Sequence, residues 1–179
     1  PYRVAAEGDD EFRVFVLPTG LRADRELVGI EFLPGNRRAV HHMAGLFDRT
    51  GAGRLRDAGD PGSGFGTGAG GVGIPEATLE GLWTPGTESS RLPPGVTRIL
   101  PAGADVLLQV HYHRTGKEEV DQSSVALYFA DKPGDRIART AVLGQPQPPI
   151  PAGAANHRIR SVGIIPEDVE FLSVAPHMH

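Results

Sequence analysis

Six of the seven histidines in this 179-residue chain fall into three groups whose members are adjacent or one residue apart. The groups are His41-His42, His111-Tyr112-His113 and His177-Met178-His179. Each group lies in, or at the end of, an apolar run of strand length. A protein metal site needs several imidazoles that converge from different strands. We therefore predict metal binding, with these ligands: His41, His42, His111, His177 and His179.

The spacing within each group sets how it can bind an ion. In an H-x-H pattern on a strand both side chains point to the same face, about 6.5–7 Å apart along the chain. His177 and His179 can therefore hold one ion together. The adjacent His41 and His42 point to opposite faces of a regular strand, so they share an ion only if the strand twists or bulges there, or if the ion sits at the sheet edge. That arrangement suits an ion that accepts a near-linear pair of imidazoles plus a third ligand, as Cu(I) does.

Four further side chains could in principle be ligands. His157 follows Asn156 in a turn-like stretch, and we interpret it as an ordinary surface histidine. Met43 and Met178 neighbour histidines but point to the other face of a strand, which favours core packing over thioether ligation. His113 shares the H-x-H spacing with His111, and the sequence leaves both interpretations of it open.

Composition excludes several other chemistries. The chain has no cysteine, which removes disulfides, thiolate ligands and cysteine nucleophiles. Neither G-x-S-x-G nor H-E-x-x-H occurs, so a serine hydrolase or a zincin has no support. The formal net charge is −4 with no basic stripe, which argues against a nucleic-acid partner. No apolar run exceeds strand length, so we predict no transmembrane segment. The carboxylates Glu118, Glu119 and Asp121 are predicted to be solvated in a charged hairpin.

The elements that position the histidines are predicted to be short strands. Apolar residues alternate with period two, and turn residues divide the runs, which favours strands over helices. The predicted strands are Phe12–Val16, Val28–Phe32, Val40–Phe47, a run ending at Ile99, Val106–Tyr112 and Val125–Phe129. This spacing predicts an all-β fold, an antiparallel, jelly-roll-like β-sandwich. Pro75–Leu82 is the one weak helix candidate, and the glycine-dense stretch Asp60–Gly73 is predicted to be a mobile surface loop.

A proline-rich stretch from Gln145 to Ala155 predicts a domain boundary. We assign residues 1–144 to an N-terminal metal-binding sandwich and residues 145–179 to a linker and the first strands of a second sandwich. Those first strands are predicted at Arg158–Val162 and Val169–Val174. Both ends of the chain look cut, so we expect a fragment of a longer protein that lacks the remainder of its second domain.

Four motifs occur in the order found in one known family. They are Ala39-Val40-His41-His42-Met43, Arg91-Leu92-Pro93-Pro94-Gly95-Val96, Leu107-Leu108-Gln109-Val110-His111-Tyr112 and Pro176-His177-Met178-His179. The chain thereby resembles the type II copper, ascorbate-dependent monooxygenases, the family of peptidylglycine α-hydroxylating monooxygenase and dopamine β-monooxygenase. The residues around His111 and His177 resemble those of bacterial members of the family more than those of the animal enzymes. The resemblance runs from about Phe12 to His179.

The resemblance implies two copper sites and a reaction. His41, His42 and His111 match the ligands of the electron-transfer copper, and His177 and His179 match two ligands of the oxygen-binding copper. The third ligand of that second site, a methionine, lies beyond the chain end in the family pattern, so we expect this chain alone to be inactive. The implied activity is hydroxylation of an activated C–H bond of a small-molecule or peptide-like substrate, with dioxygen and with ascorbate as electron donor. A periplasmic or extracellular location is also implied. The absence of cysteine departs from the disulfide-rich animal enzymes.

Three other functions stay open at this point. A non-catalytic copper-binding or electron-relay module would need only the His41, His42 and His111 site. A zinc-dependent hydrolase would use three histidines plus water, but it also needs a carboxylate base, and the sequence offers no convincing candidate. A purely structural sandwich would bind no metal at all.

Overall fold

The computed structural model describes residues 1–69, 71–89, 91–144 and 150–176. The chain divides into two compact units, Pro1–Thr140 and Ala141–His179. The boundary between the units, at residues 140 and 141, lies close to residue 144, the predicted end of the first domain. Each unit is described by itself below.

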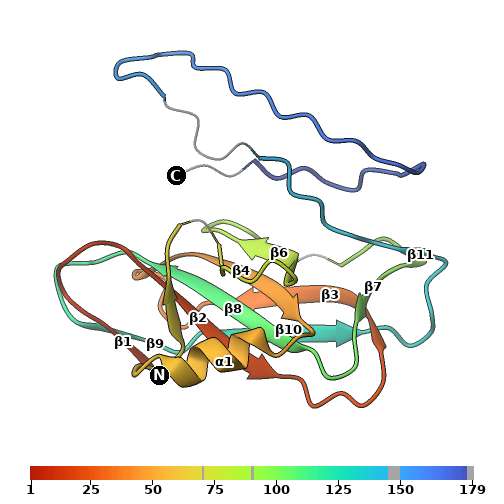
Figure 1. Cartoon of the computed structure of the whole chain (residues 1–179), viewed down its shortest axis with the longest axis horizontal. Coiled ribbons are helices and arrows are strands. Elements are labelled where there is room, and N and C mark those ends of the chain that lie inside the picture. Colours follow the sequence, from red (N-terminus) through yellow and green to blue (C-terminus); the bar gives the residue numbers. More distant parts are fainter. Residues whose placement is uncertain (70, 90, 145–149, 177–179) are drawn as a thin grey trace. The chain divides into compact units, whose positions relative to one another are not determined.

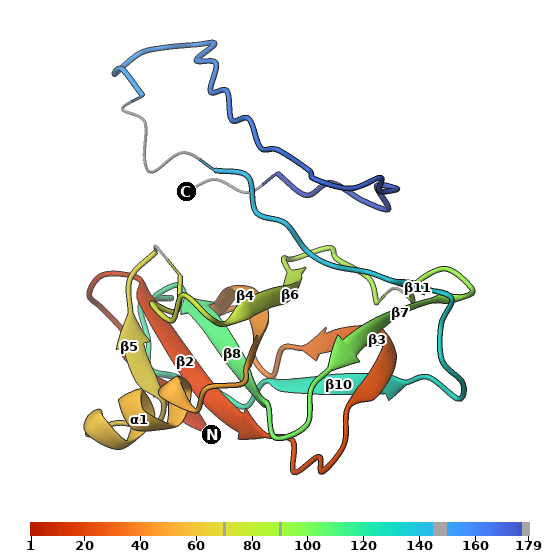
Figure 2. The same ribbon diagram turned by 45° about the vertical axis from the view of Figure 1, so that its right-hand side comes forward.

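The first unit contains a five-stranded sheet that carries three of the predicted ligands, His41, His42 and His111. Its strand order is β5-β2-β8-β4-β6, and every neighbouring pair is antiparallel. The strands are β2 (Glu11–Pro18), β4 (Val40–Asp48), β5 (Phe65–Thr67), β6 (Thr78–Trp83) and β8 (Asp105–Tyr112). The central strand β8 runs between β2 and β4 (Figure 2), so histidines at its end lie beside both neighbours.

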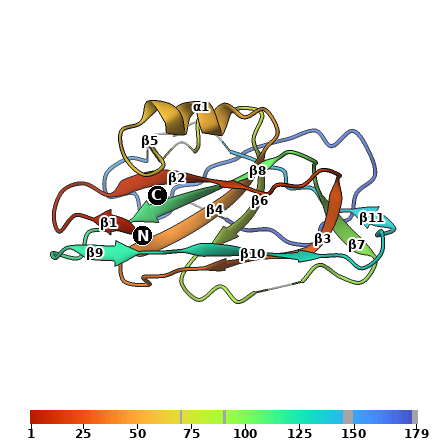
Figure 3. The same ribbon diagram turned by 90° about the horizontal axis from the view of Figure 1, so that it is seen from below.

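A second sheet packs against the first and completes a sandwich. Its order is β10-β3-β7-β11, built from β3 (Arg25–Leu33), β7 (Val96–Leu100), β10 (Ser124–Phe129) and β11 (Arg136–Ile137). All of these pairs are antiparallel except the two-residue parallel pair of β7 and β11. A small ladder of β1 (Tyr2–Val4) and β9 (Glu119–Asp121) lies beside them. The layers are seen edge-on in Figure 3. The all-β sandwich predicted from the sequence is therefore confirmed.

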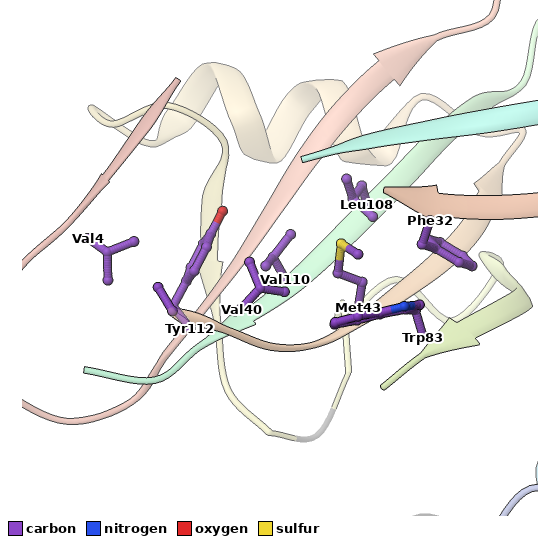
Figure 4. Packing of buried hydrophobic residues seen from close by; sticks show 9 residues of the cluster. Val4, Phe32, Val40, Met43, Trp83, Leu108, Val110 and Tyr112 are labelled. Carbon is purple, nitrogen blue, oxygen red and sulfur yellow. The ribbon is translucent and has the colours of Figure 1, made fainter. Parts of the chain in front are cut away.

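The core between the two sheets is apolar. One cluster joins Met43 and Trp83 of the first sheet to Phe32 of the second (Figure 4). Two glycines opposite each other, Gly45 on β4 and Gly81 on β6, make room for the Phe32 ring, because a Cβ on either would lie within 3.0 Å of that ring. Met43 is fully buried here, which confirms that it is a core residue.

The outer face of the five-stranded sheet is also covered. Helix α1 (Ala52–Gly59) and the chain that flanks the edge strand β5 lie over it, on the side away from β10 (Figures 1 and 3). Val14 and Leu107 from the sheet pack there against Phe65 and Val72. Every residue of β8 is consequently buried, because both faces of that strand are covered.

The six predicted strands are confirmed as β2, β3, β4, β7, β8 and β10. The predicted helix at Pro75–Leu82 is wrong, because pairing with the edge of β4 makes Thr78–Trp83 a strand instead. The real helix, Ala52–Gly59, was missed, since it is short and Gly51 gives it no side-chain cap. The predicted loop at Asp60–Gly73 contains β5, and its Phe65 and Val72 are buried.

The second unit has little regular structure. Its described residues, 141–144 and 150–176, contain turns and irregular chain but no helix or strand. Neither Arg158–Val162 nor Val169–Val174 is a strand there, and a strand requires a partner to pair with. The second sandwich therefore stays a prediction. Across the described parts of both units, no helix has the length and apolar character needed to span a membrane.

Candidate metal centre

A bulge at the start of β4 brings two adjacent histidines to one place. Val40 pairs with Tyr112 of β8, but the next pair is His42 with His111, so His41 is an extra residue in the ladder. A regular strand would send His41 and His42 to opposite faces, whereas a bulge turns the extra side chain. This is the distortion that the sequence requires if both histidines are to share an ion.

Three imidazoles converge at this bulge. Nδ1 of His111 lies 3.0 Å from Nδ1 of His41 and 3.2 Å from Nδ1 of His42. The ligand atoms of the three residues all lie within 4.8 Å of one another, which is close enough to hold one metal ion. The ring centroids of His41 and His42 are 5.4 Å apart, farther than either lies from His111, so His111 occupies the middle of the group.

The distances match ligation. An imidazole nitrogen binds a first-row ion such as zinc at about 2.0–2.1 Å, and two such nitrogens 3.0–3.2 Å apart subtend roughly 90–105° at the ion. Hydrogen bonding explains the group less well. Each ring nitrogen offers a single in-plane N–H or lone pair, so Nδ1 of His111 cannot align with both of its neighbours.

The group is enclosed on one side and open on the other. His42 and His111 are each 5% exposed, whereas His41 is exposed. On β2, the ring of Phe12 stacks on the ring of His111 with centroids 4.0 Å apart and planes 17° apart. An ion held here would therefore have an apolar wall on one side and solvent access beside His41.

A carboxylate lies behind His111. Nε2 of His111 is 2.9 Å from Oδ2 of Asp10, and Nδ1 of His113 is 3.0 Å from Oδ1 of the same carboxylate. Burial opposes ionisation of Asp10, but the hydrogen bonds from the two histidines outweigh it, and the pKa of the carboxyl lies below its usual value. His113 is therefore placed outside the three-histidine group, as a partner of Asp10.

Asp10 was not predicted from the sequence. It precedes β2, about a hundred residues from His111 along the chain, and it belongs to no motif. No local pattern signals such a contact. Only the pairing of Phe12 with His111, which places the start of β2 beside the end of β8, brings the carboxylate to the ring.

Another carboxylate, which is buried, connects the two segments that carry the histidines. Asp121 is 2% exposed, so its predicted solvation is wrong. It accepts a hydrogen bond from the hydroxyl of Tyr112, next to His111, and another from the backbone N–H of Asn36. The carbonyl of Asn36 in turn accepts from the N–H of Val40, which leads into His41.

His157, interpreted from the sequence as an ordinary surface histidine, is exposed and lies outside the three-histidine group. His177 and His179, predicted to form the second site, fall outside the described residues, as does Met178. The second site stays a prediction.

Comparison with known proteins adds no assignment, because neither a family model nor a curated protein matches this chain.

Proposed function

We propose that His41, His42 and His111 bind one copper ion, and that this centre is the electron-transfer site of a copper-dependent, ascorbate-using monooxygenase. The observation that carries the proposal is the convergence of three Nδ1 atoms at a bulge between β4 and β8. The motif order described above supports the monooxygenase part of it.

The donor set favours copper among the available ions. Imidazole nitrogens suit copper, zinc, iron and nickel, and a given site of this kind generally binds Cu(II) most tightly of the divalent first-row metals. Thiolate ligands are excluded, because the chain has no cysteine. The position of His111 between two flanking histidines also suits Cu(I), which accepts few ligands and a near-linear pair.

The surrounding side chains fit an electron-transfer role. When bound, copper would supply a one-electron couple between Cu(I) and Cu(II). The chain would hold the ligands in a fixed arrangement. His42 and His111 are buried on paired strands, and the ring of Phe12 packs on the ring of His111. The exposed His41 leaves a side on which a small reductant has access.

The second half of the proposed enzyme rests on the sequence alone. His177 and His179 would contribute to the oxygen-binding copper, and the C–H bond hydroxylated would belong to a small-molecule or peptide-like substrate. Export to the periplasm or beyond the cell belongs to the same proposal.

The test compares copper with zinc and then examines redox behaviour. The full chain is titrated with each ion in a competition assay, and the copper-loaded form is treated with ascorbate under argon while its Cu(II) EPR signal is followed. We expect tighter binding of copper and complete loss of the signal at one electron per ion, with return of the signal on reoxidation. Tighter binding of zinc would favour a hydrolase, and copper that ascorbate does not reduce would contradict the electron-transfer role.

A further inference from the structure

The strongest unassigned feature outside the three ligands is the carboxylate of Asp10. The proposed function does not require it. Yet its Oδ2 lies 2.9 Å from Nε2, on the edge of the His111 ring opposite the other two ligands. His111 is the central ligand, so whatever fixes its ring orientation fixes the geometry of the whole centre.

An ionised carboxylate can only accept a hydrogen bond, so the Nε2 that faces it must carry the hydrogen. In a neutral imidazole the lone pair is then on Nδ1, which is the atom that faces His41 and His42. A metal-binding histidine commonly donates its other ring N–H to a carboxylate, which sets the tautomer and makes the ligand more basic. Asp10 thus selects the nitrogen that the geometry of the group needs.

The segment that carries Asp10 is held in place. The guanidinium of Arg114 donates to the backbone carbonyls of Ala5 and Asp9 and to the carboxylate of Glu11. These contacts fix the chain on both sides of Asp10. The second oxygen of the carboxylate is held by His113, whose Nδ1 lies 3.0 Å away. The carboxylate is therefore positioned before any ion binds.

We infer that Asp10 is a positioning residue of the metal centre, which holds the His111 ring in the Nε2–H tautomer with Nδ1 aimed at the ion, and that His113 orients the carboxylate. This inference rests on the proposed function, since it needs an ion at the three histidines. It gives the His111-x-His113 pattern two separate roles: the first histidine binds the ion, and the second binds the carboxylate behind it.

The test uses three variants of the full chain. Asp10→Ala removes the acceptor, and Asp10→Asn keeps an acceptor oxygen of the same shape but removes its charge. Asp9→Asn is the matched control, because it makes the same change of net charge one residue away, at an exposed side chain. Circular dichroism checks that each variant is folded, and the isosteric Asp10→Asn keeps the question answerable if Asp10→Ala does not fold.

Two readouts are taken from each variant. The first is the imidazole tautomer in the metal-free protein, read by ¹⁵N NMR, where we expect His111 to be in the Nε2–H form in the wild type and in Asp9→Asn, and to lose that preference in Asp10→Ala. The second is Cu(II) affinity by chelator competition. Loss of such a partner typically weakens binding about 10- to 100-fold, and we expect Asp10→Ala to show this and Asp10→Asn to be intermediate.

The outcomes separate the two proposals. If the wild type binds one copper and both Asp10 variants bind it as tightly as Asp9→Asn, the positioning role is overturned while the three-histidine site stands. An unchanged His111 tautomer in Asp10→Ala would overturn it as well. If the wild type binds no copper, the proposed function itself fails and the role of Asp10 toward an ion fails with it.

Discussion

His111 is the residue on which the candidate centre depends most. It lies between His41 and His42, its far edge contacts Asp10, and its face is covered by Phe12. Its ring therefore has contacts on three sides before any ion is present. Removing the contact with Asp10 or with Phe12 should loosen the ring without removing a ligand.

Phe12→Leu tests the contact on the face of the ring. Leucine keeps apolar bulk but loses the stacked pair, and such pairs contribute about 0.5–1.5 kcal/mol. We therefore expect copper affinity to fall about 2- to 10-fold, with the stoichiometry unchanged, in a chelator competition. Phe15→Leu is the matched control, because Phe15 is on the same strand but packs toward the core between the sheets. Equal losses in both variants would show a general effect on the fold.

The sequence identifies the histidines but does not fix their geometry. Their types and grouping were sufficient to select His41, His42 and His111, and the need for a bulge could be stated in advance. The bulge itself could not be predicted, because it depends on the register between β4 and β8 rather than on residues 40–42. Asp10 was unpredictable for the same reason, since its partner lies on another strand.

At the scale of the elements, helix α1 and the chain between α1 and β6 cover the outer face of the sheet that carries the three histidines. The segment between α1 and β5 is tied to β2 through Asp60, which is bonded by the backbone N–H groups of Gly62 and Gly66 and by the guanidinium of Arg13. These contacts, with the backbone bonds the largest cause, lower the pKa of Asp60 from 3.8 to about 2.

Asp60→Asn should therefore remove a contribution to stability that depends on pH. A carboxyl whose pKa is lower in the folded protein stabilises the fold above its unfolded pKa, and that stabilisation is lost as pH falls from about 4 toward about 2. In chemical unfolding measured from pH 6 to pH 2, we expect the variant to be less stable at pH 6 and the difference to shrink on acidification. Asp57→Asn, on the neighbouring helix, is the control. A difference that does not change with pH would contradict the assignment.

The elements themselves were predicted unevenly. Strands with period-two alternation were found because that pattern reflects two faces in different surroundings. Two errors, the helix expected at Pro75–Leu82 and the one missed at Ala52–Gly59, concern short segments. Their structure is decided by what they pack against, β4 for the first and Leu107 with Asp48 for the second. Over segments this short, the intrinsic helix or strand propensity of the residues is too weak to decide which structure forms.

At the scale of the whole molecule, the three candidate ligands and Asp10 all belong to the unit Pro1–Thr140. The sheet order that brings β2, β8 and β4 together is formed within that unit. Sequence periodicity predicts a sandwich but does not rank the strand orders available to it, so this order came only from the structure.

A chain ending at Thr140 should consequently keep the centre. Because the three histidines and the strands that carry them all lie within residues 1–140, we expect this shortened protein to fold and to bind one copper ion with the affinity of the full chain. Isothermal titration of both proteins under the same conditions measures this. Loss of the tight site on shortening would mean that residues 141–179 contribute to it.

The central claim, that His41, His42 and His111 form one copper site, is tested most directly by copper titration of the full chain with EPR of the oxidised form. We predict one tight equivalent whose spectrum shows nitrogen ligands, and loss of that equivalent in His111→Ala and in His41→Ala but not in His157→Ala, which lies outside the group. A full tight equivalent retained in His111→Ala, or lost in His157→Ala, would contradict the assignment.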